Sequence, residues 1–347
     1  MSTQSSPQQT PLDDTLLYET YPGFTSTSKS VHPDLDHTAS RRAQFVEENQ
    51  WASGPHNAPL DYGFETESLQ IPARDGTCID ARFYNPIETT KDTRLPLLFI
   101  VHGGGWVQGT YITEERWILK PLALTLSTAS SKSPARPRPR FRAISIHYRL
   151  APEHPYPTPL NDSWNALSWI AAPAQTARFG IDPQRILVAG SSAGGNIAAA
   201  LSQLAHDSSP PIPLCGVFLN VPALCHPDHF PKYRYRWESF DTYASPMRVV
   251  WQLYLAGDAS QGCQPTASPF LGVLEDLPPH FVAIAGSCPL RDEGMAYVRR
   301  LREAGVKVEE RVYEDSGHTF AEDYAHPKTS QFWADMGACL GPLLNEK

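Results

Sequence analysis

The stretch VAGSSAGG, Val188 to Gly195, decides the fold class of this chain. It contains the pattern G-x-S-x-G, with Ser192 at its centre, between an apolar strand candidate and an apolar helix candidate. A turn from strand to helix this sharp needs small residues on both sides of the serine, and it lifts the hydroxyl above the sheet at a helix N-terminus. The spacing differs from the G-x-G-x-x-G of dinucleotide-binding turns, and the loop lacks a P-loop lysine. The stretch therefore predicts that Ser192 is a nucleophile held above the sheet.

Strand and helix candidates alternate on both sides of this turn. The expected strands are Phe64 to Ile71, Cys78 to Tyr84, Leu97 to Val101, Arg142 to Tyr148, Arg185 to Gly190, Cys215 to Val221, His280 to Ala285 and Val306 to Tyr313. The expected helices are Glu114 to Leu126, Asn161 to Ala171, Ala193 to Ala205, Asp292 to Ala304 and Pro327 to Leu344. Strands that alternate with helices of about 10 to 15 residues predict a mostly parallel sheet, covered by helices on both faces.

Several segments fall outside this alternation. The N-terminal region is polar or irregular, apart from one helical candidate at Ala39 to Asn49, and Ser127 to Arg140 has the Ser-, Pro- and Arg-rich composition of a loop insertion. Residues 223–272 are rich in aromatic side chains and lie between two expected strands, which predicts a cap that encloses a ligand. The expected domains are a disordered tail at 1–15, an N-terminal cap contribution at 16–60, a core at 61–222 and 273–347, and a cap insertion at 223–272.

A second glycine-rich stretch, VHGGGWV from Val101 to Val107, directly follows a buried strand candidate. Acyl transfer develops negative charge on a carbonyl oxygen, and preorganised backbone N–H groups stabilise that charge, each by about 2.7–4 kcal/mol. Glycine lets the backbone approach a substrate without a Cβ in the way. We therefore expect the amides of Gly104, Gly105 and Ala193 to form an oxyanion hole. His102 is expected to shape this loop rather than to act as a base.

The third element of the expected site is His318, in the segment EDSGHTF just after the last expected strand. Among the 12 histidines, it has the right place in the chain order for the base that takes the proton of Ser192. The two glycine-rich loops and this histidine, in this order, indicate acyl transfer by a serine nucleophile.

Composition and charge limit the class of protein. Hydrophobic residues make up 41% and aromatic residues 10% of the 347 residues, so a substantial core can form. The net charge of −8 argues against phosphate-backbone binding, so no nucleic-acid partner is expected. The six cysteines contain no CxxC pair, which predicts reduced thiols, no zinc site and a cytoplasmic location. We expect neither a secretory signal nor a membrane span, because the N-terminus has no apolar signal region and no long apolar run occurs.

Five motifs together resemble the hormone-sensitive-lipase family of α/β-hydrolases. They are, in chain order, HGGGW, HYRLAPEHPYPTPLND (His147 to Asp162), GSSAGGN, PLRDEG and GHTF. The resemblance runs from about Phe64 to Leu344. It implies an eight-stranded α/β-hydrolase sheet with a helical cap, hydrolysis of carboxylic esters without a cofactor or metal, and homodimers formed through the last strand and helix. It also implies that Tyr148, Arg149 and Glu153 form a buried polar network below the site.

The chain departs from this family at the catalytic acid. The family motif reads D-P-L-R-D-E-G, whereas this chain has Cys288 at the position of the first aspartate. The acid holds the histidine in the right tautomer and stabilises the imidazolium, and a neutral thiol offers little to a cation. The carboxylate can come instead from Asp292, which we take as the expected acid, or from Asp228 after the sixth strand. Alternatively, Cys288 pairs with His318 as a thiolate, or a serine–histidine dyad works without an acid. Ser191 is a smaller departure, because the family favours an acidic residue there.

These features make a serine hydrolase the leading expectation. Its substrate would be a small or medium carboxylic ester or a lactone, including those of specialised metabolites, and it would react through an acyl-serine. Two other functions use the same pocket: a lyase, cyclase or acyltransferase, and a ligand-binding protein with a weakened triad. An acyl-serine would favour the hydrolase or the acyltransferase, whereas catalysis that survives Ser192→Ala would favour the lyase. The presence of both Ser192 and His318 speaks against a pure binding protein.

Overall fold

The computed structural model describes residues 62–87, 89–90, 92–128, 139–231 and 240–345. The expected tail, the N-terminal cap contribution and the helical candidate at Ala39 to Asn49 lie outside the described residues, as does most of the insertion at Ser127 to Arg140. The domain boundaries given above therefore stay predictions. Across the described ranges, every helix is too short or too polar to cross a lipid bilayer.

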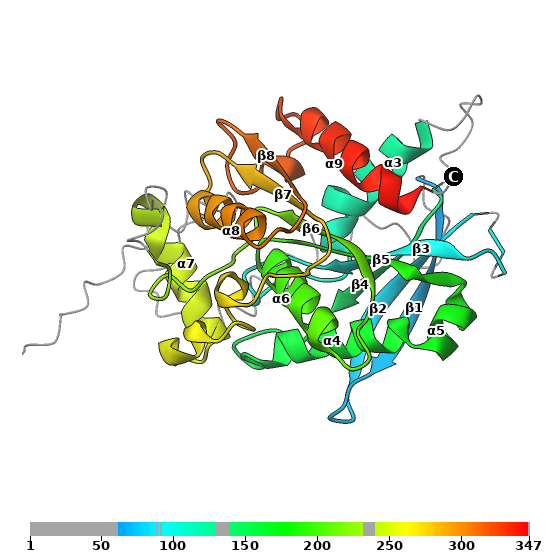
Figure 1. The fold of residues 1–347 in the computed structure, drawn as a ribbon, viewed down its shortest axis with the longest axis horizontal. Coiled ribbons are helices and arrows are strands. Elements are labelled where there is room, and N and C mark those ends of the chain that lie inside the picture. Colours follow the sequence, from blue (N-terminus) through cyan, green and yellow to red (C-terminus); the bar gives the residue numbers. More distant parts are fainter. Residues whose placement is uncertain (1–61, 88, 91, 129–138, 232–239, 346–347) are drawn as a thin grey trace, which may run out of the picture.

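A single sheet of eight strands forms the centre of the fold (Figure 1). The strands are β1 (Phe64–Pro72), β2 (Cys78–Pro86), β3 (Leu95–Val101), β4 (Arg142–His147), β5 (Ile181–Ser191), β6 (Leu214–Asn220), β7 (His280–Ala285) and β8 (Val308–Tyr313). Their order in the sheet is β1-β2-β4-β3-β5-β6-β7-β8. β2 runs antiparallel to both of its neighbours, and the other pairs are parallel. The mostly parallel, eight-stranded sheet expected from the sequence is confirmed.

The burial of each strand follows its place in the sheet. All seven residues of β3 and all six residues of β7 are buried, as expected for parallel strands that helices cover on both faces. The edge strand β8, with the sequence VEERVY, is mostly half-exposed. The loops that leave the carboxyl ends of the buried strands therefore gather at one edge of the sheet, where ligands bind in folds of this class.

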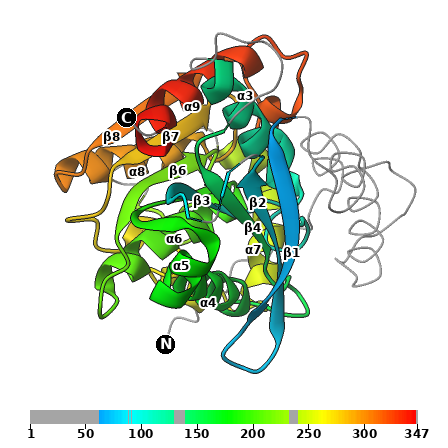
Figure 2. The same ribbon diagram turned by 90° about the vertical axis from the view of Figure 1, so that its right-hand side faces the viewer.

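Helices cover both faces of this sheet. They are α3 (Lys120–Thr128), α4 (Thr158–Ala171), α5 (Pro173–Phe179), α6 (Ala193–Asp207), α7 (Phe240–Tyr254), α8 (Arg291–Glu303) and α9 (Thr329–Leu344). The short helices are η1 (Glu115–Leu119), a π-helix, and the 3₁₀-helices η2 (Ala259–Cys263), η3 (Pro269–Leu271) and η4 (Phe320–Glu322). Figures 1 and 2 show α3 and α9 on one face of the sheet and α4, α5 and α6 on the other. α8 packs against β7 and β8.

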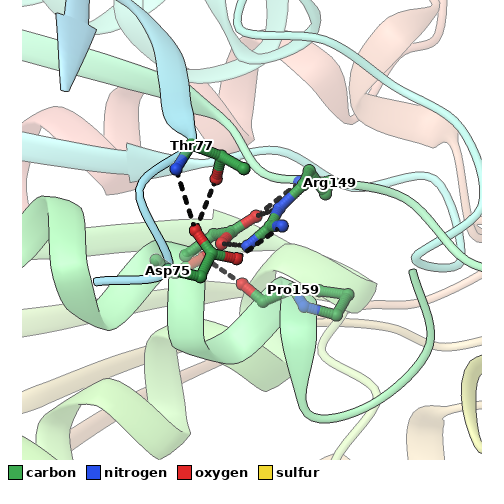
Figure 3. A network of polar contacts seen from close by, with 6 residues as sticks. Asp75, Thr77, Arg149 and Pro159 are labelled. Carbon is green, nitrogen blue, oxygen red and sulfur yellow. Dashed lines mark hydrogen bonds and ion pairs between the residues drawn. The ribbon is translucent and has the colours of Figure 1, made fainter. Parts of the chain in front are cut away.

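Arg149 ties the turn between β1 and β2 to helix α4 (Figure 3). Its guanidinium lies 2.8 Å from Asp75 Oδ2 in that turn and 2.7 Å from Oδ1 of Asp162, a buried carboxylate on α4. The Thr77 hydroxyl also donates to Asp75 at 2.7 Å. The hydrogen bonds from Thr77, followed by that from Arg149, lower the pKa of Asp75 to about 2. The guanidinium therefore joins the carboxylates of Asp75 and Asp162 and fixes the segment after β4.

The same segment supports the loop that follows β3. The Tyr148 hydroxyl donates to the His102 carbonyl at 2.9 Å, and the two rings stack with centroids 4.1 Å apart. Tyr148 and Arg149 therefore have the bracing role that the family resemblance implied. The third expected member of this network, Glu153, is exposed, so its predicted burial is wrong. It lies in a surface turn, so its carboxylate keeps access to solvent.

A second buried charge pair joins β2 to η1. Glu115 Oε1 lies 2.9 Å from Arg82 Nη1, and both side chains are buried. Tyr62 donates to Glu115 Oε2 at 3.1 Å, and Tyr84 donates to Oε1. Both carboxylate oxygens therefore have hydrogen-bond donors, as a buried charge requires.

Candidate active site

Ser192 stands on the turn between β5 and α6, with φ 54° and ψ −116°. A residue other than glycine is strained in this region of backbone space, and such strain is frequent at active sites. A Cβ on Gly190 would lie 2.3 Å from Gly194 O, and a Cβ on Gly194 would lie 2.1 Å from Val101 O. Both flanking positions therefore require glycine, as the pattern G-x-S-x-G predicted.

His318, on the loop between β8 and η4, faces the serine. Its Nε2 lies 2.9 Å from Ser192 Oγ. Ser192 is only 9% exposed. Burial lowers the pKa of His318 to about 4, so the imidazole is neutral at neutral pH. A neutral imidazole can accept the serine proton through Nε2, provided that Nδ1 carries the other proton.

Cys288, on the loop between β7 and α8, contacts the other nitrogen of the imidazole. Its Sγ lies 3.1 Å from His318 Nδ1 and accepts a hydrogen bond from the Leu290 N–H at 3.3 Å. Burial raises the pKa of the Cys288 thiol to about 12, which favours the neutral thiol over the thiolate considered above. The loop that carries the thiol is fixed to the histidine loop, because the Ser287 N–H donates to Ser316 O at 3.0 Å.

The two carboxylates considered as the acid have ion pairs of their own. Asp292, in the first turn of α8, lies 2.8 Å from Arg291 Nε. Asp228 lies 2.9 Å from Arg248 Nη1 and is half-exposed. The thiol already occupies the position next to the imidazole Nδ1. A catalytic role for Asp292, the acid expected from the sequence, would require the carboxylate to leave Arg291 and displace the sulfur.

The amides expected to form the oxyanion hole lie at the start of α6 and on the loop after β3. Gly104 and Gly105 have φ of +112° and +60°, a backbone that favours glycine. Among the described residues, the N–H groups of Gly104, Gly105 and Ala193 donate to no protein acceptor. Because Val101 on β3 pairs with Gly190 on β5, the glycine loop starts beside the turn that carries Ser192. The role of these three amides as an oxyanion hole stays a prediction.

His102 fixes the glycine loop from the inside. Its Nδ1 lies 2.7 Å from Gly103 O, and a Cβ on Gly109 would lie 2.3 Å from the same nitrogen. Burial lowers the pKa of His102 to about 3. These contacts agree with the expectation that His102 shapes the loop.

Glu114 is a site residue that the sequence analysis missed. It is fully buried, directly before η1. Its Oε1 accepts the Gly103 N–H at 2.9 Å, and its Oε2 accepts the Ser191 hydroxyl, also at 2.9 Å. Burial raises its pKa to about 7. The sequence carries no signal for this contact, since TEERW resembles the polar start of any surface helix.

Helix α7 packs on the same glycine loop. The Tyr254 ring stacks on Trp106 with centroids 4.3 Å apart and an interplanar angle of 5°. A Cβ on Gly105 would lie 2.9 Å from Val250 Cγ1. Because α7 belongs to the range 223–272, these contacts support the expectation that this segment covers the site.

The arrangement has the parts that acyl transfer needs. A hydroxyl lies 2.9 Å from a neutral imidazole nitrogen, and unused amides lie on neighbouring loops to receive a developing oxyanion. Within the described ranges, no three His, Cys, Asp or Glu side chains are grouped as metal ligands.

Comparisons with known proteins give similarities that span most of the chain. A family model described as alpha/beta hydrolase fold matches residues 98–322. Carboxylesterase NlhH of Mycobacterium tuberculosis is 36% identical over 236 residues, which cover 67% of this chain and 68% of that protein. The structure of EstE1, a thermostable carboxylesterase from a metagenomic library, aligns with a TM-score of 0.73 at 27% identity and covers 89% of this chain and 98% of that one. The structure of vibralactone cyclase aligns with a TM-score of 0.76 at 25% identity and covers 99% and 98%.

Proposed function

This chain belongs to the α/β-hydrolase family, in its hormone-sensitive-lipase-like carboxylesterase branch, and we propose that Ser192 is the nucleophile with which it hydrolyses carboxylic esters. The observation that carries the proposal is the 2.9 Å contact between His318 Nε2 and Ser192 Oγ at the strained turn after β5. The unused amides of Gly104, Gly105 and Ala193 support it.

The proposed reaction has two halves. Ser192 Oγ attacks the ester carbonyl while His318 Nε2 takes the hydroxyl proton, and the three amides donate to the oxyanion. The intermediate collapses to the acyl-serine, and the departing alcohol takes the proton from His318. Water then attacks the acyl-serine with His318 again as the base, which releases the carboxylic acid and restores the serine.

The thiol of Cys288 supports the position of the imidazole but not its charge. When Nδ1–H donates to Sγ, the imidazole is held in the tautomer that leaves Nε2 free to accept. A neutral sulfur adds no negative charge to stabilise the imidazolium. His318 is therefore a weak base, and the substrates that fit it best are esters with an electrophilic carbonyl, such as acetyl esters of good leaving groups, and strained lactones.

The partner we propose is a small-molecule ester, and α7 supplies aromatic residues beside the site. The relatives of this chain include the carboxylesterases NlhH and EstE1, whose names state that they act on carboxylic esters. We also propose a cytoplasmic location, which the six free cysteines support. Homodimers would form at β8, which is the edge strand of the sheet within the described residues and could pair there with a second copy.

A cyclase or lyase is the second candidate. Two observations favour it: a thiol stands where a carboxylate would help esterase turnover, and the similarity to vibralactone cyclase spans 99% of this chain. Such a reaction would use the imidazole as a base and the amides as an oxyanion hole, without hydrolysis. It would then persist, at least in part, in a Ser192→Ala variant.

The proposal is tested with a fluorophosphonate label and p-nitrophenyl acetate. We expect the wild-type protein to take up one label on Ser192 and to release p-nitrophenol, and Ser192→Ala to do neither. Hydrolysis by Ser192→Ala at the wild-type rate would assign the chemistry elsewhere and would move the search to elimination or ring closure.

A further inference from the structure

We propose that Glu114 is a positioning residue, whose carboxylate holds the oxyanion loop in register with the turn that carries the nucleophile. This inference rests on the proposed function, because it concerns the geometry of the same acyl-transfer site. It assigns a role to a side chain that belongs to neither glycine-rich motif and that would not touch the substrate.

The carboxylate joins two loops that come from different strands. One oxygen accepts the N–H of Gly103, on the loop after β3, and the other accepts the hydroxyl of Ser191, the last residue of β5. Both distances are 2.9 Å, and the Glu114 side chain is completely buried. Glu114 therefore connects the residue before the expected oxyanion donors to the residue before the nucleophile.

The contact also selects which amides remain available to a substrate. The Gly103 N–H is bound to Glu114, whereas those of Gly104 and Gly105 have no protein acceptor among the described residues. The loop approaches the strand so closely at this point that a Cβ on Gly103 would lie 2.9 Å from Ser191 O. A fixed Gly103 peptide fixes the start of the turn that orients the next two amides.

Ser191 is the second anchor of this arrangement. Its hydroxyl receives a hydrogen bond from Asn220 Nδ2 at 3.1 Å and donates to Glu114 Oε2. The chain has serine at the position where its family favours an acidic residue. A carboxylate is nevertheless present beside that position, because Glu114 brings one from the segment before η1.

The neighbouring Glu115 provides a matched control. It is also a buried glutamate, but its carboxylate binds Arg82, Tyr62 and Tyr84, away from both glycine-rich loops. Its replacement should lower the stability of the fold without changing turnover by the folded enzyme. A comparison of variants at Glu114 and Glu115 therefore separates a positioning effect from a purely structural one.

The test compares Glu114→Ala, Glu114→Gln and Glu115→Gln in the full chain, with p-nitrophenyl acetate as the substrate. We expect Glu114→Ala to lower kcat by ~100-fold with KM within ~3-fold, because misplaced oxyanion donors weaken binding of the transition state alone. Glu114→Gln keeps an acceptor for Gly103 and should lose only ~10-fold or less. Glu115→Gln should keep the wild-type kcat per labelled serine and melt at a lower temperature.

Two further measurements check whether Glu114 acts through its contacts with Ser191 and Gly103. In a double-mutant cycle, Ser191→Ala should lower kcat in the wild-type background and have no additional effect in Glu114→Ala, since both act through one contact. Hydrogen exchange of the peptide that contains Gly103 to Trp106 should be faster in Glu114→Ala than in the wild type or Glu115→Gln, and Glu114→Gln, which keeps an acceptor for Gly103, should lie in between. This second measurement needs no turnover, so it tests the contact even if Ser192 proves not to be the nucleophile.

Opposite results would overturn the inference. If kcat per labelled serine and KM both stay at wild-type values in both Glu114 variants while only the melting temperature falls, Glu114 is a structural residue. A higher KM at constant kcat would place its effect on substrate binding instead. Unchanged exchange in the Gly103 to Trp106 peptide would show that the carboxylate does not hold the loop.

Discussion

The Cys288 sulfur lies 3.1 Å from His318 Nδ1, on the far side of the imidazole from Ser192. The three side chains thus form a line in which a thiol occupies the place of the triad acid. In serine proteases, replacing the aspartate with its neutral amide lowers turnover by about 10⁴-fold. The thiol differs from that amide, because it accepts the Nδ1 proton and keeps the right tautomer. We therefore expect a slow enzyme that is correctly assembled.

Restoring the carboxylate should raise activity. Cys288→Asp should increase kcat on p-nitrophenyl acetate by ~10-fold or more, because an anion next to Nδ1 stabilises the imidazolium formed in the transition state. Cys288→Ser, which adds no charge, should stay within ~3-fold of the wild type. Loss of activity in a folded, fluorophosphonate-reactive Cys288→Asp protein would mean that a thiol at this position is required.

The pH at which kcat/KM is lost on the acid side of the pH profile should be unusually low. The active form of His318 is neutral, and burial lowers its pKa to about 4. kcat/KM should therefore hold steady as the pH falls to about 5 and disappear as it falls through about 4, whereas an ordinary histidine would lose activity near 6.5. In Cys288→Asp the carboxylate favours the imidazolium, so this loss should move to higher pH. A wild-type loss near pH 6.5 that Cys288→Asp leaves in place would contradict this account.

Asp292 should be dispensable for turnover. Asp292 forms an ion pair with Arg291, and Cys288 contacts the imidazole. Asp292→Asn should therefore change kcat by less than ~5-fold while it removes one half-buried ion pair. The measurement is kcat on p-nitrophenyl butyrate, with labelled serine as the count of active sites. A collapse of kcat by ~1000-fold or more would instead identify Asp292 as the acid.

The turn around the nucleophile should not tolerate a methyl group. Gly194→Ala would place a Cβ 2.1 Å from Val101 O, so we expect loss of fluorophosphonate labelling and destabilisation by ~3 kcal/mol. Gly294→Ala, within helix α8, is the matched control, because its Cβ would lie 3.4 Å from Ile284. That variant should keep its activity and gain up to about 1 kcal/mol. Equal thermal stability of the two variants would argue against the close approach at Gly194.

Much of the fold could be predicted, because apolar runs and glycine turns are local signals. The strand His280 to Ala285 has the predicted bounds, and the helix after Ser192 begins at the predicted Ala193. The helix Pro173–Phe179 was missed, because only Ala172, in extended conformation, separates it from the preceding helix. The single helix expected after the glycine loop begins instead as a π-helix.

The site could be predicted in part for the same reason. Ser192 and His318 lie in motifs of their own, and the chain order alone suggested that they meet. The partner of Nδ1 could not be chosen from sequence, since Cys288 and Asp292 are one helical turn apart and their directions depend on the loop geometry. Glu114 contacts Ser191 across 77 positions in the chain, so only the folded arrangement brings this pair together.

The assignment of Ser192 as the nucleophile is tested most directly by trapping the acyl-enzyme. Wild-type protein and Cys288→Asp are mixed with p-nitrophenyl acetate, quenched in acid within the first turnover and digested for peptide mass mapping. We expect one acetyl group on Ser192, formed more slowly in the wild type than in Cys288→Asp. Turnover without an acetyl group on Ser192, with the acetyl group elsewhere or absent at every quench time, would contradict the assignment of Ser192 as the nucleophile.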